Sequence, residues 1–253
     1  MSAAKQLVLD DISIDYGSFR AAQHVSLSVA PGEVLGIVGE SGSGKSTVAR
    51  AIMGMVGISA GRMIYGAATL GMKRSHEMRR RFQMVFQDPR SALNPRMRCF
   101  DILAEVWNTH PEVLEGQSPD AYARDLFARV DLAPELLQRR PRNLSGGQAQ
   151  RVAIARALAA RPDVLVCDEA VSALDVSVQA QIVELIGSLR RDLGVTIIFI
   201  THDLGVVRQL ADRIAVMRSG KLEELAATED LFSNPSSAYT RMLLGAALDL
   251  RTF

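Results

Sequence analysis

The segment Gly39–Thr47 constrains the fold of this chain more than any other part of its sequence. It follows the apolar run Val34–Val38 and opens the segment Thr47–Met53, which carries alanine and isoleucine. Glycines let backbone N–H groups converge on anionic oxygens, and the start of a helix adds partial positive charge. The order of buried strand, glycine-rich turn and helix therefore predicts a phosphate-binding loop.

Two side chains of this loop have chemistry that suits a phosphate group and its metal ion. Lys45 supplies a point charge for β- and γ-phosphate oxygens, and the hydroxyl of Ser46 is placed for Mg²⁺. The alternative is a glycine-rich connector with an incidental lysine, which the strand and helix on either side disfavour. The loop consists of Gly39, Glu40, Ser41, Gly42, Ser43, Gly44, Lys45, Ser46 and Thr47.

The composition is that of an ordinary globular protein. Of the 253 residues, 48% are hydrophobic and 23% are charged, which is enough to build a sizeable core. No apolar run is long enough to span a bilayer, and Met1–Val8 lacks the pattern of a signal peptide. We therefore expect a cytosolic protein, which can still lie against a membrane protein. A net charge of +1 and two cysteines without metal-like spacing give no reason to expect nucleic acid or a cysteine-bound metal.

Charged side chains follow two further apolar strands. Val164–Cys167 is followed by Asp168 and Glu169, and Val195–Ile200 is followed after one residue by His202. Strands of parallel α/β sheets carry ligand groups at their carboxyl ends. One carboxylate can hold Mg²⁺ there, and another can polarise an attacking water. The alternatives are a solvated strand end for the acidic pair and a helix start for His202.

A second polar turn with glycines precedes the helical segment Val152–Ala159. Its serine and its glycine amides can face an anion at a helix N-terminus. Taken alone, the turn is equally well explained as a capped helix start. Beside a phosphate loop it becomes a second anion-facing element. The turn residues are Ser145, Gly146, Gly147 and Gln148.

One residue at the end of a predicted strand is a further candidate. Tyr16 ends the strand predicted at Leu7–Tyr16, where packing at the rim of the core is the alternative to stacking on adenine. Gln87 follows the apolar strand Phe82–Phe86, and the chain leaves the sheet there.

The middle of the sequence contains a basic cluster and a helical region. Arg74 and Arg79–Arg81 predict a solvated face, with a partner contact as the alternative. From Asp101 to Leu137 the pattern is amphipathic and helical, broken by loop signals near Pro111. This region is predicted to be a helical insertion between strands rather than an independent domain.

Taken in order, these motifs resemble the nucleotide-binding subunit of ABC transporters over roughly 7–244. Finer features resemble the branch of oligopeptide, dipeptide and nickel importers, and within it the F-type ATPase. The branch features are Phe86-Gln87-Asp88-Pro89, Leu93-Asn94-Pro95-Arg96, Val176–Gln181 and Tyr239-Thr240-Arg241. The F-type features are Val166-Cys167-Asp168-Glu169 and Val171-Ser172-Ala173-Leu174-Asp175.

The resemblance implies an α/β fold with the core of a P-loop NTPase. That core has a mainly parallel sheet, with an N-terminal antiparallel β subdomain and an inserted α-helical subdomain. The chain is expected to form a single ABC ATPase domain over 1–253. The nucleotide-binding core would comprise 1–87 and 156–225, the helical subdomain 88–155, and a C-terminal helical tail 226–253.

The resemblance also implies the cofactors ATP and Mg²⁺ and a role for each candidate. Tyr16 would stack on adenine, Glu169 would be the general base, and His202 would bind the γ-phosphate. Asp168 and Gln87 would contact the metal ion, and Gln87 would link the site to a membrane subunit. The amides of 42–45, the Lys45 ammonium and the hydroxyls of Ser46 and Thr47 would hold phosphates and Mg²⁺.

Each ATP site would need two ATPase chains. Ser145 and Gly147 would reach the γ-phosphate bound by the opposite subunit, and Asp175 would lie at the seam of the dimer. The implied partners are a D-type ATPase paralogue, two membrane-spanning permease subunits and an external solute-binding protein, without nucleic acid. The assembly would lie at the cytoplasmic side of the cell membrane and import peptides, nickel or related small solutes as ATP closes the dimer.

The chain departs from the family pattern at three positions. Ala170 stands where proline is typical, which loosens the restraint on φ beside Glu169. Ala226 and Ser237 replace a usual glycine and a usual histidine. We still expect ATP hydrolysis because every polar catalytic position is filled.

Two other functions fit parts of the pattern. A soluble ABC ATPase acting on nucleic acid or ribosomes would need coiled-coil arms, a second ATPase unit or a basic stripe, which the sequence lacks. An accessory ATPase of a phosphonate-degrading complex has a similar sequence pattern. Co-purification with two multi-span membrane proteins would favour the transporter over both.

Overall fold

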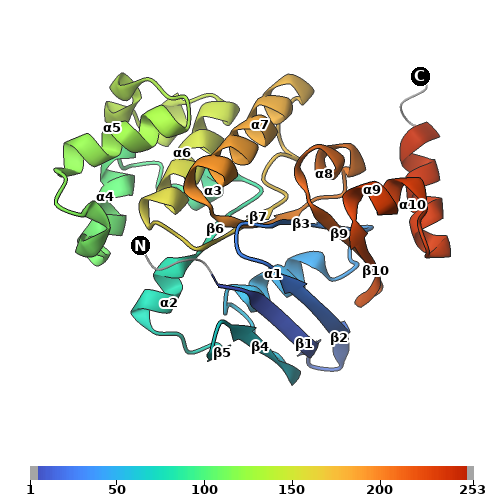
Figure 1. The fold of residues 1–253 in the computed structure, drawn as a ribbon. Helices are drawn as coiled ribbons and strands as arrows, with labels where there is room; N and C mark the ends of the chain where they lie inside the picture. The colour runs from blue at the N-terminus through green and yellow to red at the C-terminus, as the bar shows by residue number, and fades with distance from the viewer. Residues whose placement is uncertain (1–4, 250–253) are drawn as a thin grey trace.

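The computed structural model describes residues 5–249, which form two β-sheets surrounded by helices (Figure 1). The first sheet is antiparallel, with the strand order β2-β1-β4-β5. β1 pairs with β2 from Leu7 opposite Val29 to Tyr16 opposite Phe19, so a two-residue turn joins the strands. The strands are β1 (Leu7–Tyr16), β2 (Phe19–Val29), β4 (Ala60–Tyr65) and β5 (Ala68–Leu70).

The second sheet has the order β10-β9-β3-β8-β7-β6, and only β10 is antiparallel to its neighbour. Strands β3 and β8 are buried along their whole length, as expected for strands covered on both faces. The carboxyl ends of the parallel strands therefore meet at one edge. The strands are β3 (Val34–Val38), β6 (Phe82–Val85), β7 (Val164–Asp168), β8 (Thr196–Ile200), β9 (Arg213–Arg218) and β10 (Lys221–Ala227).

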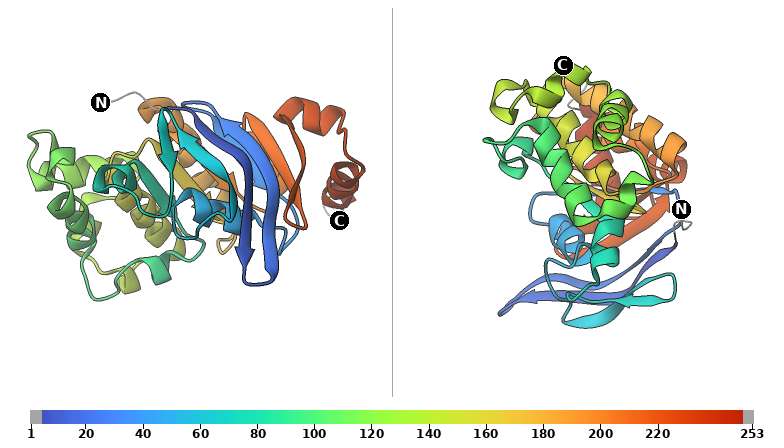
Figure 2. Two further views of the ribbon diagram at one scale, coloured as in Figure 1. Left: turned by 90° about the horizontal axis from the view of Figure 1, so that it is seen from below. Right: turned by 90° about the vertical axis from the view of Figure 1, so that its left-hand side faces the viewer.

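Helices cover both faces of this sheet and extend beyond its ends. Helices α4 and α5 lie at one end of the molecule, and α9 and α10 lie at the other (Figures 1 and 2). The α-helices are α1 (Lys45–Ile52), α2 (His76–Arg81), α3 (Pro89–Ala92), α4 (Cys99–Thr109), α5 (Pro119–Arg129), α6 (Gly146–Ala159), α7 (Val176–Leu193), α8 (Leu204–Leu210), α9 (Thr228–Ser233) and α10 (Ala238–Asp249). Short 3₁₀ turns are η1 (Pro111–Leu114), η2 (Pro134–Gln138) and η3 (Pro141–Asn143).

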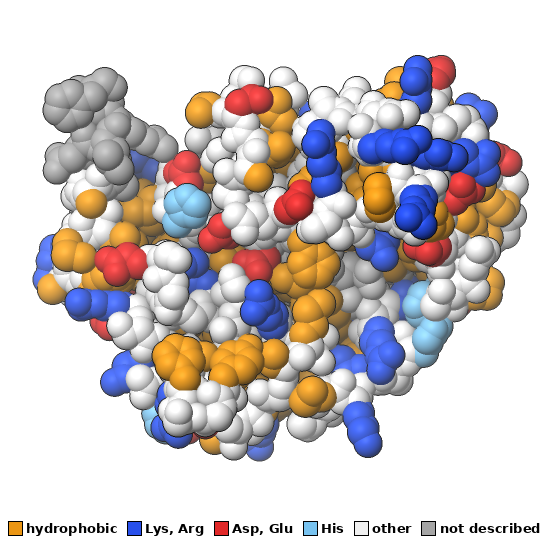
Figure 3. Space-filling view, turned by 180° about the vertical axis from the view of Figure 1, so that it is seen from behind, with side chains coloured by type: hydrophobic (Ala, Val, Ile, Leu, Met, Phe, Trp, Pro, Cys, Tyr) orange, Lys and Arg blue, Asp and Glu red, His pale blue; other side chains and the backbone are white. Residues whose placement is uncertain are grey.

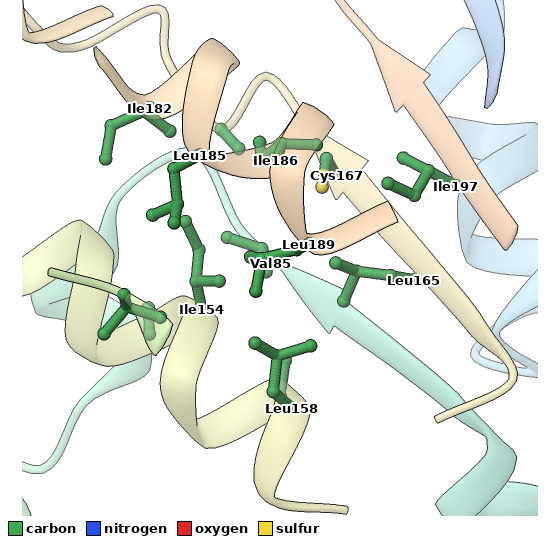
Figure 4. Close-up of a cluster of buried hydrophobic side chains, with 14 of the residues drawn as sticks. Val85, Ile154, Leu158, Leu165, Cys167, Ile182, Leu185, Ile186, Leu189 and Ile197 are labelled. Atoms are coloured by element: carbon green, nitrogen blue, oxygen red, sulfur yellow. The ribbon is translucent and has the colours of Figure 1, made fainter. Parts of the chain in front are cut away.

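Two hydrophobic clusters hold these layers together. In one, Val48 and Ile52 of α1 are buried with residues of both sheets, so α1 is packed between the sheets. In the other, α6 and α7 cover β6, β7 and β8 through side chains such as Ile154, Leu185 and Leu165 (Figure 4). This cluster continues into α4 and α5, which ties the helical region to the sheet. The predicted fold class, with a mainly parallel sheet, an antiparallel sheet and inserted helices, is confirmed.

The prediction of a solvated face for the basic cluster is wrong for three of its four arginines. Arg74 is buried and lies over the ring of Phe82. Arg80 donates a hydrogen bond to the carbonyl of Ala160, and Arg81 forms ion pairs with Glu77 and Asp163. Both side chains are mostly buried because they join α2 to the end of α6 and the start of β7. Within the described residues, no helix combines the length and apolar character needed to cross a membrane.

Candidate functional site

The phosphate loop connects β3 to α1, as predicted. Gly39, Gly42 and Gly44 have φ angles of 147°, 79° and 100°, which L-residues rarely adopt. A side chain at Gly39 would also overlap the carbonyl of Met217 on β9. The loop is therefore restricted to glycine both by backbone conformation and by its close approach to the neighbouring strand.

Lys45 begins helix α1 and points back into the loop. Its Nζ donates to the carbonyls of Gly39 and Glu40 at 2.8 and 2.7 Å and lies 3.3 Å from Ser43 Oγ. The residue is only 4% exposed. Burial lowers the pKa of Lys45, and the carboxylates of Glu169 and Asp168 act in the opposite direction. The ammonium is thus held in place inside the loop.

Ser46 and Asp168 meet across 122 residues of sequence. The Ser46 hydroxyl donates to Asp168 Oδ1 at 2.9 Å. Burial raises the pKa of Asp168, whereas the bond from Ser46 lowers it. A hydroxyl and a carboxylate are hard oxygen ligands that suit Mg²⁺. No cluster of three acidic, histidine or cysteine ligands occurs among residues 5–249, so phosphate oxygens and water would complete the coordination.

Glu169 and His202 lie beside this pair at the ends of adjacent strands. Asp168 of β7 is in register with Ile200 of β8, and the Glu169 amide donates to the Ile200 carbonyl at 2.9 Å. His202 Nδ1 lies 3.8 Å from Glu169 Oε1. The structure therefore brings together three polar residues that the sequence placed at strand ends.

Gln87 is connected to the same turn through Ser172. Its Nε2 donates to Ser172 Oγ at 3.1 Å, and Ser172 Oγ donates to the Glu169 carbonyl at 3.0 Å. No separate role was predicted for Ser172. Its position shortly after Asp168 and Glu169 indicates that it lies near the site, but nothing in the sequence indicates its contact with Gln87.

A pocket of about 230 Å³ opens beside the phosphate loop. Glu169 lines it together with Gly42, Lys45 and Ser46, so the loop and Glu169 share one space. Phe19 also lines it and is 64% exposed. Sequence reasoning missed Phe19, whose aromatic ring three residues after Tyr16 was the available signal.

Tyr16 lies next to this pocket without lining it. Tyr16 pairs with Phe19 across the β1–β2 turn, and Tyr16 is 44% exposed. Both rings are therefore available for stacking, and the adenine role of Tyr16 stays a prediction.

The second glycine turn caps helix α6 away from the pocket. Ser145 Oγ accepts from the Gln148 amide at 3.2 Å, and the Ser145 amide donates to Gln148 Oε1 at 3.0 Å. This reciprocal cap leaves the start of α6 exposed. A side chain at Gly147 would overlap Val178 of α7, so the glycine permits close helix packing. Within one chain, the structure does not bring Ser145, Gly146, Gly147 and Gln148 to the pocket of the phosphate loop.

Asp175 caps the neighbouring helix α7. Its Oδ1 accepts from the Val178 amide at 3.1 Å and from the Ser177 hydroxyl at 2.9 Å. The hydrogen bond from the Val178 amide lowers the pKa of Asp175 most, and the hydrogen bond from the Ser177 hydroxyl lowers it further. Val176, the next residue, is 84% exposed, so this end of α7 presents an apolar side chain to solvent.

An apolar groove lies on another part of the surface, next to Gln87. It is lined by residues of β6, α6 and the loop after α1, with Met55 and Phe86 exposed by 48% and 37%. Arg79 and Arg156 line it, so Arg79, the remaining arginine of the basic cluster, lies at a mixed apolar and basic surface. Exposed hydrophobic side chains also lie among basic ones on the face shown in Figure 3.

Comparisons with known proteins show which proteins this chain resembles in sequence and in fold. The ABC transporter family model matches residues 22–172. The oligopeptide transport ATP-binding protein OppF of Salmonella typhimurium is 45% identical over 232 residues, covering 90% of this chain and 70% of OppF. OppF of Escherichia coli is 44% identical over the same length and coverage. The dimeric ATP-binding cassette MJ0796, solved with ADP and Pi, superposes with a TM-score of 0.76 and 27% identity, covering 88% of this chain and 98% of the cassette.

Proposed function

The chain belongs to the ABC transporter family, and we propose that it is the ATP-hydrolysing subunit of an importer for peptides or related small solutes. The observation that carries the proposal is the shared pocket of the phosphate loop and Glu169, beside the Ser46–Asp168 pair. The similarity to OppF supports peptides as the solute class. ATP and Mg²⁺ are the cofactors of this ATPase, and the oxygen ligands of Ser46 and Asp168 fit the metal ion.

Each residue of the pocket would have its own role in the transfer of the γ-phosphoryl group to water. Amides of the loop and the Lys45 ammonium would bind the β- and γ-phosphates, and Ser46 with Asp168 would hold Mg²⁺, which would neutralise phosphate charge. Glu169 would accept a proton from the attacking water as the water oxygen bonds to the γ-phosphorus and the bond to the leaving oxygen breaks. His202 lies 3.8 Å from Glu169 and would contact the γ-phosphate.

We further propose that each site is completed by a second ATPase chain. The exposed cap of α6, with Ser145 and Gly147, lies apart from the pocket of its own chain. The dimeric form of MJ0796 with ADP and Pi supports such an arrangement. Asp175 and the exposed Val176 would then lie at the seam. The partner chain is proposed to be a D-type paralogue, which gives a heterodimer.

The groove at Met55 and Phe86 is proposed to contact a permease subunit. Its apolar, exposed lining ends beside Gln87, which reaches the Glu169 carbonyl through Ser172. A permease segment seated there would be connected to the ATP site by three hydrogen-bonding residues. We therefore place the chain at the cytoplasmic face of the membrane, with two permeases and an external solute-binding protein. We propose a division into a core of 1–87 and 156–225, a helical subdomain of 88–155 and a tail of 226–253, although the boundary at 155/156 lies inside α6 and that at 225/226 inside β10.

Affinity purification of the tagged chain from native membranes tests this function. We expect two multi-span membrane proteins and a second ATPase to co-purify, and a deletion strain to lose uptake of defined peptides. A matched strain carrying the wild-type chain on a plasmid should recover uptake. Purification with a phosphonate-cleaving enzyme instead, or with ribosomes or nucleic acid, would contradict the proposal.

A further inference from the structure

The turn that begins at Glu169 is held by Ser172. The amide and the hydroxyl of Ser172 donate to the Glu169 carbonyl at 3.1 and 3.0 Å. Ala170 and Val171, which lie between them, are each 1% exposed and belong to the hydrophobic cluster that includes residues of β7. Glu169 itself lines the pocket beside the phosphate loop. One serine and two buried apolar residues therefore hold the backbone from which the Glu169 side chain reaches this pocket.

The Ser172 hydroxyl also joins this turn to the end of a neighbouring strand. β6 and β7 are parallel, with Val85 opposite Cys167. Gln87 and Glu169 each lie two residues beyond that pair, so the chain leaves both strands at the same level. Gln87 Nε2 donates to Ser172 Oγ at 3.1 Å. A hydroxyl has one proton, which Ser172 donates to the Glu169 carbonyl, so the same oxygen accepts from Gln87.

The backbone conformation of Glu169 makes these bonds important for its side chain. Its φ of 50° lies in the left-handed region, which a non-glycine residue keeps only where its surroundings hold it. A general base must lie within hydrogen-bond reach of the proton that it accepts. A less restrained turn would therefore move the carboxylate relative to the phosphate loop while the loop itself stays unchanged.

We propose that Ser172 is a positioning residue for ATP hydrolysis, whose hydroxyl holds Glu169 in place and makes that placement depend on Gln87. The inference rests on the proposed function, because it takes Glu169 as the general base. Ser172 is not among the described residues that line the pocket, so it acts through Glu169 rather than on ATP. Without the hydroxyl, the bond from the Ser172 amide remains, so the turn should persist with less restraint.

Steady-state ATP hydrolysis by the assembled complex tests this role. We expect Ser172→Ala to lower kcat about five- to thirtyfold, as loss of one or two hydrogen bonds would, with the KM for ATP nearly unchanged. Ser172→Thr keeps the hydroxyl and should restore most of kcat. Ser172 is not among the described residues with positive φ, so a β-branched side chain is compatible with its backbone.

Ser188→Ala is a matched control for the loss of the hydroxyl. Ser188 of α7 is also half-buried, and its hydroxyl donates to the carbonyl three residues earlier, that of Leu185, at 2.8 Å. Ser172 makes the same kind of bond to Glu169. Ser188→Ala should therefore leave both kcat and KM at the wild-type values, and an equal fall of kcat in both variants would contradict a specific role for Ser172.

A double-mutant cycle tests the dependence on Gln87. Gln87→Ala should lower kcat more in the wild type than in Ser172→Ala, where the bond between the two side chains is already lost. We expect the double variant to fall at least about threefold less than the product of the two single falls. Falls that simply multiply would overturn the dependence on Gln87.

A second substitution serves if Ser172→Ala does not fold. Ser172→Cys fills the same place with a thiol, which is a weak donor and a weak acceptor, and it should lower kcat about three- to tenfold.

The outcomes distinguish this inference from the function on which it rests. If Glu169→Gln is inactive, an unchanged kcat in the folded Ser172 variant would overturn the positioning role alone. A raised KM with an unchanged kcat would also overturn it, because Ser172 would then act on binding. Near wild-type turnover of Glu169→Gln would overturn the proposed base and this inference together.

Discussion

Glu169 has a backbone conformation that few non-glycine residues adopt. Its φ is 50°, which typically costs about 1–3 kcal/mol and persists only where the surroundings fix it. The fixing contacts are the bond from its amide to Ile200 and the bonds to its carbonyl from the Ser172 amide and hydroxyl. A residue that precedes proline prefers extended backbone, so alanine at 170 is compatible with this left-handed turn. The structure shows a turn held by hydrogen bonds at the position where the sequence suggested a loosened restraint.

Replacing Glu169 by glutamine should separate ATP binding from hydrolysis. The amide cannot accept the proton of water as a carboxylate does, so turnover should fall by about 10²-fold or more. ATP affinity should stay near the wild-type value because the phosphate loop is unchanged. The control is Glu184→Gln on the exposed face of α7, which should hydrolyse ATP normally. Near wild-type turnover of Glu169→Gln in the assembled complex would contradict the assignment of Glu169 as the general base.

The two cysteines should be unreactive in the folded protein. Burial raises the pKa of Cys99 to about 11 and that of Cys167 to about 12. Because the thiolate is the reactive form, both thiols should resist iodoacetamide at pH 8 in the native state. Both should react in denaturant, which serves as the control when the products are weighed by mass spectrometry. Rapid labelling of Cys167 in the native protein would show that β7 is not buried as described.

The start of helix α10 is held to the sheet by Glu224 of β10, whose carboxylate accepts hydrogen bonds from the amides of Ser236 and Ser237. Glu224 has a pKa of about 2 against an ordinary value of 4.5, so its carboxylate stabilises the fold above pH 4.5. That stabilisation is lost as the pH falls from 4.5 toward 2. At pH 7, Glu224→Gln should lower the free energy of unfolding by roughly 1–3 kcal/mol, measured by urea denaturation. The difference from wild type should shrink as the solution is acidified.

The neighbouring residue provides a control for this prediction. Glu223 is exposed beside Glu224 on β10, so Glu223→Gln should change stability little at any pH. Equal effects of the two substitutions at pH 7 would show that Glu224 does not anchor α10.

Most helices and strands could be predicted because short sequence patterns, such as apolar runs and glycine-containing turns, indicate them. The strand before the phosphate loop, the loop and α1 follow one another within 20 residues. The contacts that complete the site join residues far apart in sequence. Ser46 with Asp168, and Gln87 with Ser172, are set by the order of strands in the sheet, which no local pattern encodes. Arg80 and Arg81 were misjudged for the same reason, since Ala160 and Asp163, which hold them at the sheet, lie 80 and 82 residues away.

At the scale of the whole molecule, one chain holds two separate parts of the proposed site. The phosphate loop and Glu169 share a pocket, and the capped start of α6 with Ser145 lies outside it. In the proposed assembly, ATP bound in the pocket would lack the donors of α6 until a second chain supplied them. Closure of the two chains would be coupled to the permeases through the groove beside Gln87.

The most direct test is the rate of ATP hydrolysis by the purified chain, alone and assembled with its second ATPase and membrane subunits. We predict slow turnover alone and a rate at least about tenfold higher in the complex, because oriented donors of the second chain stabilise the transferring phosphate. Fast, concentration-independent hydrolysis by a demonstrated monomer would contradict the two-chain site. A complex that binds solute but hydrolyses no ATP would contradict the function itself.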